Sequence, residues 1–307
     1  VEQFIPQPPP FDDFTQTTHD DVYQASGYLY AHLNLPTSLL WTFGLALESS
    51  QGGLRDRERF NPKAGLTWQL TENTTFRTAV MRKLNRELRS DQTLEPTQVA
   101  GFNQFFEDTE GSEMLRYGAA LDHRFGKRLY GGAEWARREV EPVYELSVTG
   151  ETATGNAYED LARAYLYWAP VEWLAARVAY RYETYDYDVD LPLEGDIEAL
   201  ETHFLPLGLK FFCPRGVILG LTATYVAQEG EFISFGPMSP EPIVTEDDDQ
   251  FWVTDLSLGY RLPKRHGLVS LEIRNLFNER FHYQDVDDAA VEFYPERTVL
   301  GKLTFSF

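Results

Sequence analysis

The fold of this chain is decided by residues 267–307, which read GLVSLEIRNLFNERFHYQD (267–285), then an acidic segment, and then RTVLGKLTFSF (297–307). From Val299 to Phe307 every second residue is apolar or glycine, and most of the residues between them are polar. This period of two predicts a β-strand with one apolar and one polar face. A strand that runs on to Phe307 differs from the polar tails in which soluble domains commonly fray.

The composition limits the classes of protein that fit this chain. Its 307 residues carry a formal net charge of −21, which disfavours a nucleic-acid partner because phosphate binding needs a basic face. No run of apolar residues is long enough for a transmembrane helix, whereas membrane-spanning β-strands alternate and leave no such run. The single Cys213 rules out an internal disulfide, and the start without Met or signal peptide indicates a processed or partial product.

Short and long connections alternate between the candidate strands. The predicted strands are 21–35, 38–50, 59–71, 75–87, 113–125, 128–140, 157–169, 172–185, 201–213, 216–228, 250–262, 267–280 and 297–307. The short connections are 36–37, 72–74, 126–127, 170–171, 214–215 and 263–266, and the long ones are 51–58, 88–112, 141–156, 186–200, 229–249 and 281–296. Tight turns at one edge and long loops at the other are typical of membrane β-barrels, and a soluble sandwich has no reason to keep them apart.

The strands themselves are two-faced. In 38–50 the unbroken apolar face is made by Leu39, Trp41, Phe43, Leu45 and Leu47. Each apolar face is about nine to eleven residues long, the length needed to cross a bilayer at a tilt. Most tryptophans lie near strand ends, as aromatic girdles require. The fold class predicted is all-β, an antiparallel transmembrane β-barrel, with a soluble all-β protein that keeps one wet face as the alternative.

The strand count bears on the domain organisation. Thirteen strands are predicted, and closure of a bacterial barrel needs an even number. Either Val1–Ile5 supplies a fourteenth strand or the chain is the end of a longer barrel. We assign 1–20 to a Pro-rich loop or strand stub and 21–307 to the barrel.

No catalytic constellation is present in the sequence. The six histidines are scattered without HExxH, and no GxSxG elbow or phosphate-binding glycine loop occurs, so neither an enzyme nor a cofactor is expected. The predicted loops are acidic, which suits a solvated surface. Clustered carboxylates also suit Ca²⁺, bound alone or bridging lipopolysaccharide, and Asp247, Asp248 and Asp249 are weak candidates because they lack the spacing of a calcium loop.

The polar face of the strands predicts a charged lumen, because an Arg facing lipid at the bilayer midplane costs about 2–4 kcal/mol. The basic residues placed there are Lys63, Arg77, Lys83, Arg116, Arg138, Arg163, Arg177, Arg181, Lys210, Arg261, Arg274 and Lys302. The acidic ones are Glu48, Asp122, Glu134, Glu159, Glu183, Asp255 and Glu272. An internal salt-bridge ladder and a water-filled solute pathway would both have this pattern.

The connection 88–112 contains Phe102, Phe105 and Phe106. Three phenylalanines in five residues are rare in a loop that stays exposed. We therefore expect this loop to fold inward as a constriction or to bind a partner.

Three stretches resemble the β-barrels of TonB-dependent receptors of the bacterial outer membrane. They are NLFNERFHYQD with the terminal strand, RFNPKAGLTWQLTENTTFRTAVMRKLNR (59–86) and QTLEPTQVAGFNQFFEDTEGSEMLRYGAALDHRF (92–125). The chain is also similar to the barrels of outer-membrane export proteins that carry tetratricopeptide repeats. Neither a plug domain nor a TonB box precedes the barrel, so an N-terminal domain that lies outside this sequence would decide between the two.

The resemblance carries several implications. It implies an outer-membrane location, periplasmic turns and contact with lipid and lipopolysaccharide. It also implies recognition of Phe305 and Phe307 by the barrel-assembly machinery. The function implied is a channel or transporter for a solute or polymer. The alternative is a structural barrel whose lumen is filled by side chains, loops or another subunit.

Overall fold

The computed structural model of the chain describes residues 2–5, 14–17, 23–52, 56–85, 95–104, 111–145, 152–189, 197–235, 242–263, 266–284 and 293–305. Throughout these ranges the regular structure is β-strand, and α-helix is absent from them. The strands are β1 (Glu2–Ile5), β2 (Phe14–Thr17), β3 (Tyr23–Leu33), β4 (Leu39–Gln51), β5 (Arg57–Thr71), β6 (Thr74–Leu84), β7 (Gln98–Val99), β8 (Phe102–Asn103), β9 (Glu113–Arg124), β10 (Leu129–Glu141), β11 (Val143–Glu145), β12 (Thr152–Val171), β13 (Leu174–Val189), β14 (Ile197–Phe212), β15 (Val217–Phe235), β16 (Pro242–Arg261), β17 (Gly267–Arg274) and β18 (Thr298–Phe305).

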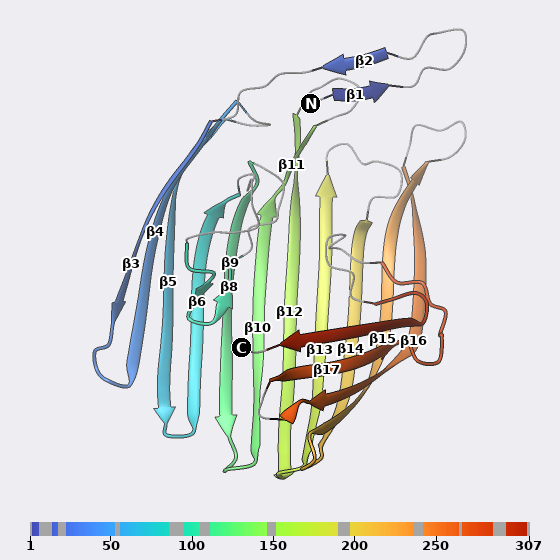
Figure 1. Cartoon of the computed structure of the whole chain (residues 1–307). Helices are drawn as coiled ribbons and strands as arrows, with labels where there is room; N and C mark the ends of the chain where they lie inside the picture. The colour runs from blue at the N-terminus through green and yellow to red at the C-terminus, as the bar shows by residue number, and fades with distance from the viewer. Residues whose placement is uncertain are drawn as a thin grey trace.

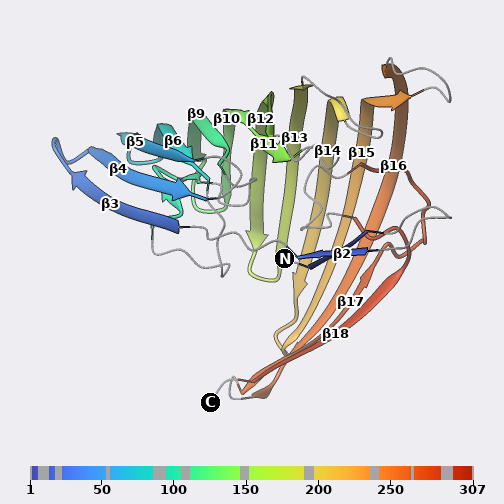
Figure 2. The same ribbon diagram turned by 90° about the horizontal axis from the view of Figure 1, so that it is seen from above.

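Thirteen of these strands form one continuous antiparallel sheet from β3 to β18, as predicted. Each pairs with the next long strand along the chain, so the sheet is an up-and-down meander (Figure 1). Its tight turns lie at one edge and its long connections at the other. Seen from above, the sheet curves into a wide arc, with β3 and β18 as its two outer strands (Figure 2). The all-β antiparallel class is confirmed.

One detail of the predicted strand count is wrong. Glu2–Ile5 does not extend the main sheet but pairs with Phe14–Thr17 in a separate two-stranded sheet. The extra strand of the main sheet is instead β11, which pairs with β12. Within the described ranges no register joins β3 to β18, so the expected closure around fourteen strands is not observed there.

Several strands are longer than the hydrophobic pattern predicts. Segment 229–249 was expected to be a loop, yet β15 and β16 continue through most of it, with Glu229 opposite Asp248. The same extension occurs in 186–200, 141–156 and 51–58. In these strand ends the regular alternation of apolar and polar residues on which the prediction depended is lost, as in the acidic run 246–249. Their backbone hydrogen bonds continue because the ladder needs no apolar face.

The NLFN segment ends β17 earlier than expected, at Arg274. Asn275 and Asn278 have φ of 49° and 56°, the left-handed conformation that asparagine tolerates better than most residues. The buried Asn275 side chain accepts a hydrogen bond from the Glu279 amide at 2.7 Å and donates to the carbonyl oxygens of Glu279 and Tyr294. Its backbone amide donates to the Asp255 carboxylate at 2.9 Å. The predicted strand 267–280 therefore becomes a strand followed by a side-chain-locked turn.

Replacing Asn275 with alanine is expected to lower the free energy of unfolding by about 1–3 kcal/mol, because buried peptide groups lose their partners. The matched control is Asn278→Ala at the exposed neighbouring turn, which removes one hydrogen bond, to the Arg297 amide. We expect that control to cost about 1 kcal/mol or less. Urea unfolding in detergent micelles measures both changes, and equal midpoints for the two variants would contradict this account of the turn.

The two faces of the sheet differ in character. Residues that alternate along each strand and face each other across the registers share a face. The outer face exposes large apolar side chains, including Phe43, Leu47, Phe60, Val80, Leu121, Trp135, Leu166, Val178, Leu207, Leu221, Leu258, Leu271, Val299 and Leu303. So continuous an exposed apolar surface marks contact with a membrane or a partner. The described part of the chain contains no helix capable of crossing a membrane.

The buried residues lie on the opposite, inner face. One cluster covers β6, β9 and β10, and a second covers β14, β15 and β16. Each cluster includes side chains from connections that fold back over the sheet. The inner face is therefore partly covered by the chain itself, and it is the region where a functional site is sought.

Candidate functional site

The strand registers bring the predicted lumen residues to one face of the sheet. Glu134 lies opposite Arg163, which lies opposite Arg181 on the next strand. Applied across every register, the alternation places all nineteen on the inner face: Lys63, Arg77, Lys83, Arg116, Arg138, Arg163, Arg177, Arg181, Lys210, Arg261, Arg274, Lys302, Glu48, Asp122, Glu134, Glu159, Glu183, Asp255 and Glu272. That they line a solute pathway stays a prediction.

Part of this face is a ladder of ion pairs across β6, β9, β10 and β12. Arg77 bonds the Asp122 carboxylate at 2.9 Å and approaches Glu134 at 3.6 Å. Arg163 reaches Glu134 at 3.1 Å from the other side, so one carboxylate is shared by two guanidinium groups. Arg138 pairs with Glu159 further along β10 and β12. These pairs agree with the predicted internal salt-bridge ladder.

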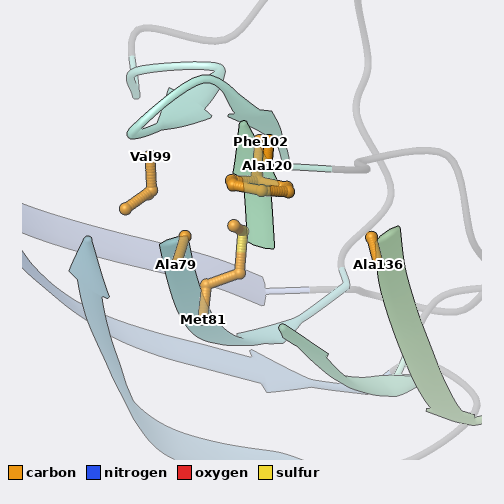
Figure 3. Packing of buried hydrophobic residues seen from close by; sticks show 6 residues of the cluster. All are labelled: Ala79, Met81, Val99, Phe102, Ala120 and Ala136. Carbon is orange, nitrogen blue, oxygen red and sulfur yellow. The ribbon is translucent and has the colours of Figure 1, made fainter. Parts of the chain in front are cut away.

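The connection 88–112 folds onto the inner face through its residues 95–104. Val99 and Phe102, from the β7–β8 hairpin, are 0% and 1% exposed. They pack on Ala79 and Met81 of β6 and on Ala120 and Ala136 of β9 and β10 (Figure 3). The small residues beneath the hairpin allow this contact. A Cβ on Gly118 would lie 2.7 Å from the Phe102 ring.

Polar contacts fasten the same segment to β3 and β5. The Lys63 ammonium group forms an ion pair with Glu95, and both side chains are buried. The Tyr30 hydroxyl donates to the Glu95 carboxylate at 2.7 Å, and the Gln104 amide donates to the Tyr30 oxygen at 2.9 Å. The Arg77 guanidinium lies 5.6 Å from the Phe102 ring centre. Phe102 is thus an inward residue, whereas Phe105 and Phe106 lie outside the described residues.

A second segment folds inward from the connection between β17 and β18. Phe281, Tyr283 and Phe293 pack against Phe204 and Phe251 of the sheet. The Gln228 side chain accepts from the Gln284 amide at 2.8 Å and donates to the Gln284 carbonyl at 3.0 Å, as a neighbouring strand would. Sequence reasoning treated 281–296 as an outer loop and missed this contact. The aromatic residues at 281, 283 and 293 were the available signal.

The remaining predicted residues divide into two groups. Lys83 and Arg116 are buried, while Asp255 accepts the Asn275 amide and Glu272 lies 3.8 Å from Arg274. The exposed inner-face residues are Arg177, Lys210, Arg261 and Lys302. Phe305 is 59% exposed on the outer face of β18, and Phe307 lies outside the described residues.

The weak calcium candidates do not form a loop. Asp247, Asp248 and Asp249 belong to β16, where neighbouring side chains point to opposite faces. Asp249 accepts hydrogen bonds from the amides of Gln250 and His282. Within the described ranges, no three His, Cys, Asp or Glu side chains are grouped to hold a metal ion. Their role as calcium ligands gains no support from this geometry.

The known proteins to which this chain is similar are found among solved structures. No family model matches the chain, and no curated protein matches it. The search of solved structures finds the outer-membrane transporter YddB of Escherichia coli, with a TM-score of 0.63, 12% identity, 96% of this chain covered and 46% of that one. The F3-3 variant of the FrpB iron transporter of Neisseria meningitidis has a TM-score of 0.64 and 16% identity, with 93% and 45% covered.

This chain has the fold of an outer-membrane transporter barrel. The open form of Fiu, described as the ferric-catecholate import receptor of Escherichia coli K12, is also similar, with a TM-score of 0.54, 10% identity and 82% and 52% coverage. The predicted resemblance to TonB-dependent barrels is confirmed at the level of the fold. This chain spans about half the length of the structures it matches.

Proposed function

We propose that the chain forms part of the wall of a transporter barrel in the bacterial outer membrane, with a solute or polymer moving along its inner face. The observation that carries this proposal is the opposition of the two faces, apolar and exposed outside, charged inside. In hydrocarbon every backbone polar group must be paired, so strands cross membranes only within barrels. A two-faced meander of this length therefore suits a barrel wall better than a soluble sheet.

The proposed partners follow from the same surfaces. Membrane lipid and lipopolysaccharide would cover the apolar outer face, and the barrel-assembly machinery would recognise Phe305 of β18 together with Phe307. A further subunit or an N-terminal domain would complete the wall at β3, since an unpaired strand edge is costly in lipid.

In this proposal the segment 95–104 acts as a constriction. It occupies the concave side of the sheet and is held by the buried pair Lys63–Glu95. The second candidate function is a structural or partner-holding barrel whose lumen is filled. The observation that favours it is the coverage of the inner face from two separate connections, by residues 95–104 and by Phe281, Tyr283 and Phe293.

Single-channel recording in a planar bilayer tests the transport proposal. We expect stepwise conductance from the protein, and larger steps when 95–104 is replaced by a Gly-Ser linker of equal length, because the constriction is removed. Heat-dependent migration on gels verifies that both forms are folded barrels. Folded protein that inserts but conducts in neither form would contradict the transport proposal and favour the filled barrel.

A further inference from the structure

A cavity of about 630 Å³ lies in the concave sheet near its tight-turn edge. Basic side chains line it from three places: Arg124, Lys127 and Arg128 at the β9–β10 turn, Arg177 on β13 and Lys210 on β14. No Asp or Glu is among its lining residues. This volume is within the range of about 300–1,000 Å³ that is typical of sites for small molecules.

The cations of this cavity differ from those on the rest of the inner face. Arg77, Arg138 and Arg163 are each neutralised by a carboxylate. Among the described residues, by contrast, no acid lies within ion-pair distance of Arg124, Arg128, Arg177 or Lys210. Like charges close together repel each other, and an anion held between them offsets that repulsion.

The backbone holds two of these cations close together. Arg177 lies opposite Gly208, and Lys210 lies opposite Ala175, so the two cations are diagonal neighbours on adjacent strands. A Cβ on Gly208 would lie 2.8 Å from the Cγ and Nε atoms of Arg177, so the glycine lets the guanidinium stem lie flat against the sheet. An arginine presents a planar fork that matches carboxylate and phosphate oxygens.

The other walls of the cavity are aromatic and hydroxylic. The aromatic side chains of Tyr130 on β10 and Tyr167 on β12 line it, and so do the hydroxyl groups of Thr222 on β15 and Ser257 on β16. Aromatic walls bind the apolar body of a ligand, and hydroxyl groups donate to its oxygens. The cations and the hydroxyl groups together suit a small ligand that carries several charged oxygens.

From these observations we infer that the cavity binds a small soluble anion bearing two or more carboxylate or phosphate groups. The guanidinium and ammonium groups of Arg177 and Lys210 hold the charged groups, and Arg124 and Arg128 attract the anion from the tight-turn edge. This site stands on its own contacts and does not depend on conduction through the barrel.

Isothermal titration of the detergent-solubilised protein with pyrophosphate, and separately with citrate, tests the inference. We expect saturable binding that weakens when NaCl is raised from about 50 mM to about 500 mM, because salt screens exposed charges. The double variant Arg177→Gln/Lys210→Gln is expected to bind at least about tenfold more weakly, since two charge-assisted contacts are lost.

Two further variants make the result decisive. Lys302→Gln removes an exposed inner-face lysine outside the cavity and is expected to leave affinity unchanged. Arg128→Gln changes an exposed turn residue with little risk to folding and is expected to weaken binding several-fold. Folded protein without saturable binding, or equal affinity for all forms, would overturn the site. Because binding is measured without a bilayer, this failure is distinct from a failure to conduct.

Discussion

Replacing Lys63 with alanine is expected to detach the segment 95–104 from the sheet at a cost of about 3–5 kcal/mol, the penalty for leaving a buried charge without its partner. The partner is Glu95, whose side chain is 3% exposed and also receives the Tyr30 hydroxyl. Hydrogen exchange of the backbone amides at 98–103 measures the release. We expect these amides to lose protection while those of β14 and β15 keep theirs, because the break is local.

Matched variants separate charge from packing in this result. The double variant Lys63→Met/Glu95→Leu is expected to recover most of the protection, since apolar pairs of similar volume replace buried ion pairs with little loss. Lys302→Ala removes an exposed lysine of the same face and is expected to change nothing. Unaltered exchange in Lys63→Ala would show that the apolar contacts of Val99 and Phe102 alone hold the segment. In the transport proposal, the same variant raises conductance.

Leu221→Arg is expected to destabilise the inserted protein by about 2–4 kcal/mol, the cost of a cation on the lipid face near the bilayer midplane. Leu221 lies on the outer face of β15, with Leu209 and Leu256 directly opposite on the two neighbouring strands. It is therefore at the centre of the apolar band. Reversible urea unfolding in lipid vesicles measures the change in the free energy of unfolding.

The neighbouring residue supplies the control. Thr222 points to the inner face, opposite Gly208 and Asp255, where an arginine finds space and a carboxylate. Thr222→Arg is expected to change stability by less than about 1 kcal/mol. Equal losses in the two variants would mean that the faces are not divided between lipid and lumen, and the soluble alternative would then be favoured.

Local pattern accounts for most of what could be predicted. The period of two identified the thirteen strands and the face on which each residue lies, because neighbouring side chains in a strand point to opposite sides. It failed where strands extend into segments without regular alternation, as in 246–249, since a ladder can continue without an apolar face. It also failed at Asn275, whose left-handed backbone ends β17 inside an apolar run.

The inward fold of the connection 88–112 was predicted from its phenylalanines alone, and the residues that it contacts could not be predicted. Phe102 is conspicuous in the sequence, but the residues that receive it come from β6, β9 and β10. Lys63 was placed on the polar face without its partner, because Glu95 is thirty-two residues away in a connection. The inward fold of Phe281 and Tyr283 had no periodic signal at all.

The sequence by itself determined an all-β meander with one apolar and one charged face, because neighbouring residues of a strand point to opposite faces and alternate in polarity here. Tertiary structure alone decided the curvature of the sheet, the two segments that cover its inner face and the group of unpaired cations near the tight turns. Arg124, Arg177 and Lys210 are far apart in the chain. Strand pairing and curvature bring them to one cavity. A pattern of neighbouring residues cannot predict this, because the three residues are far apart in the sequence.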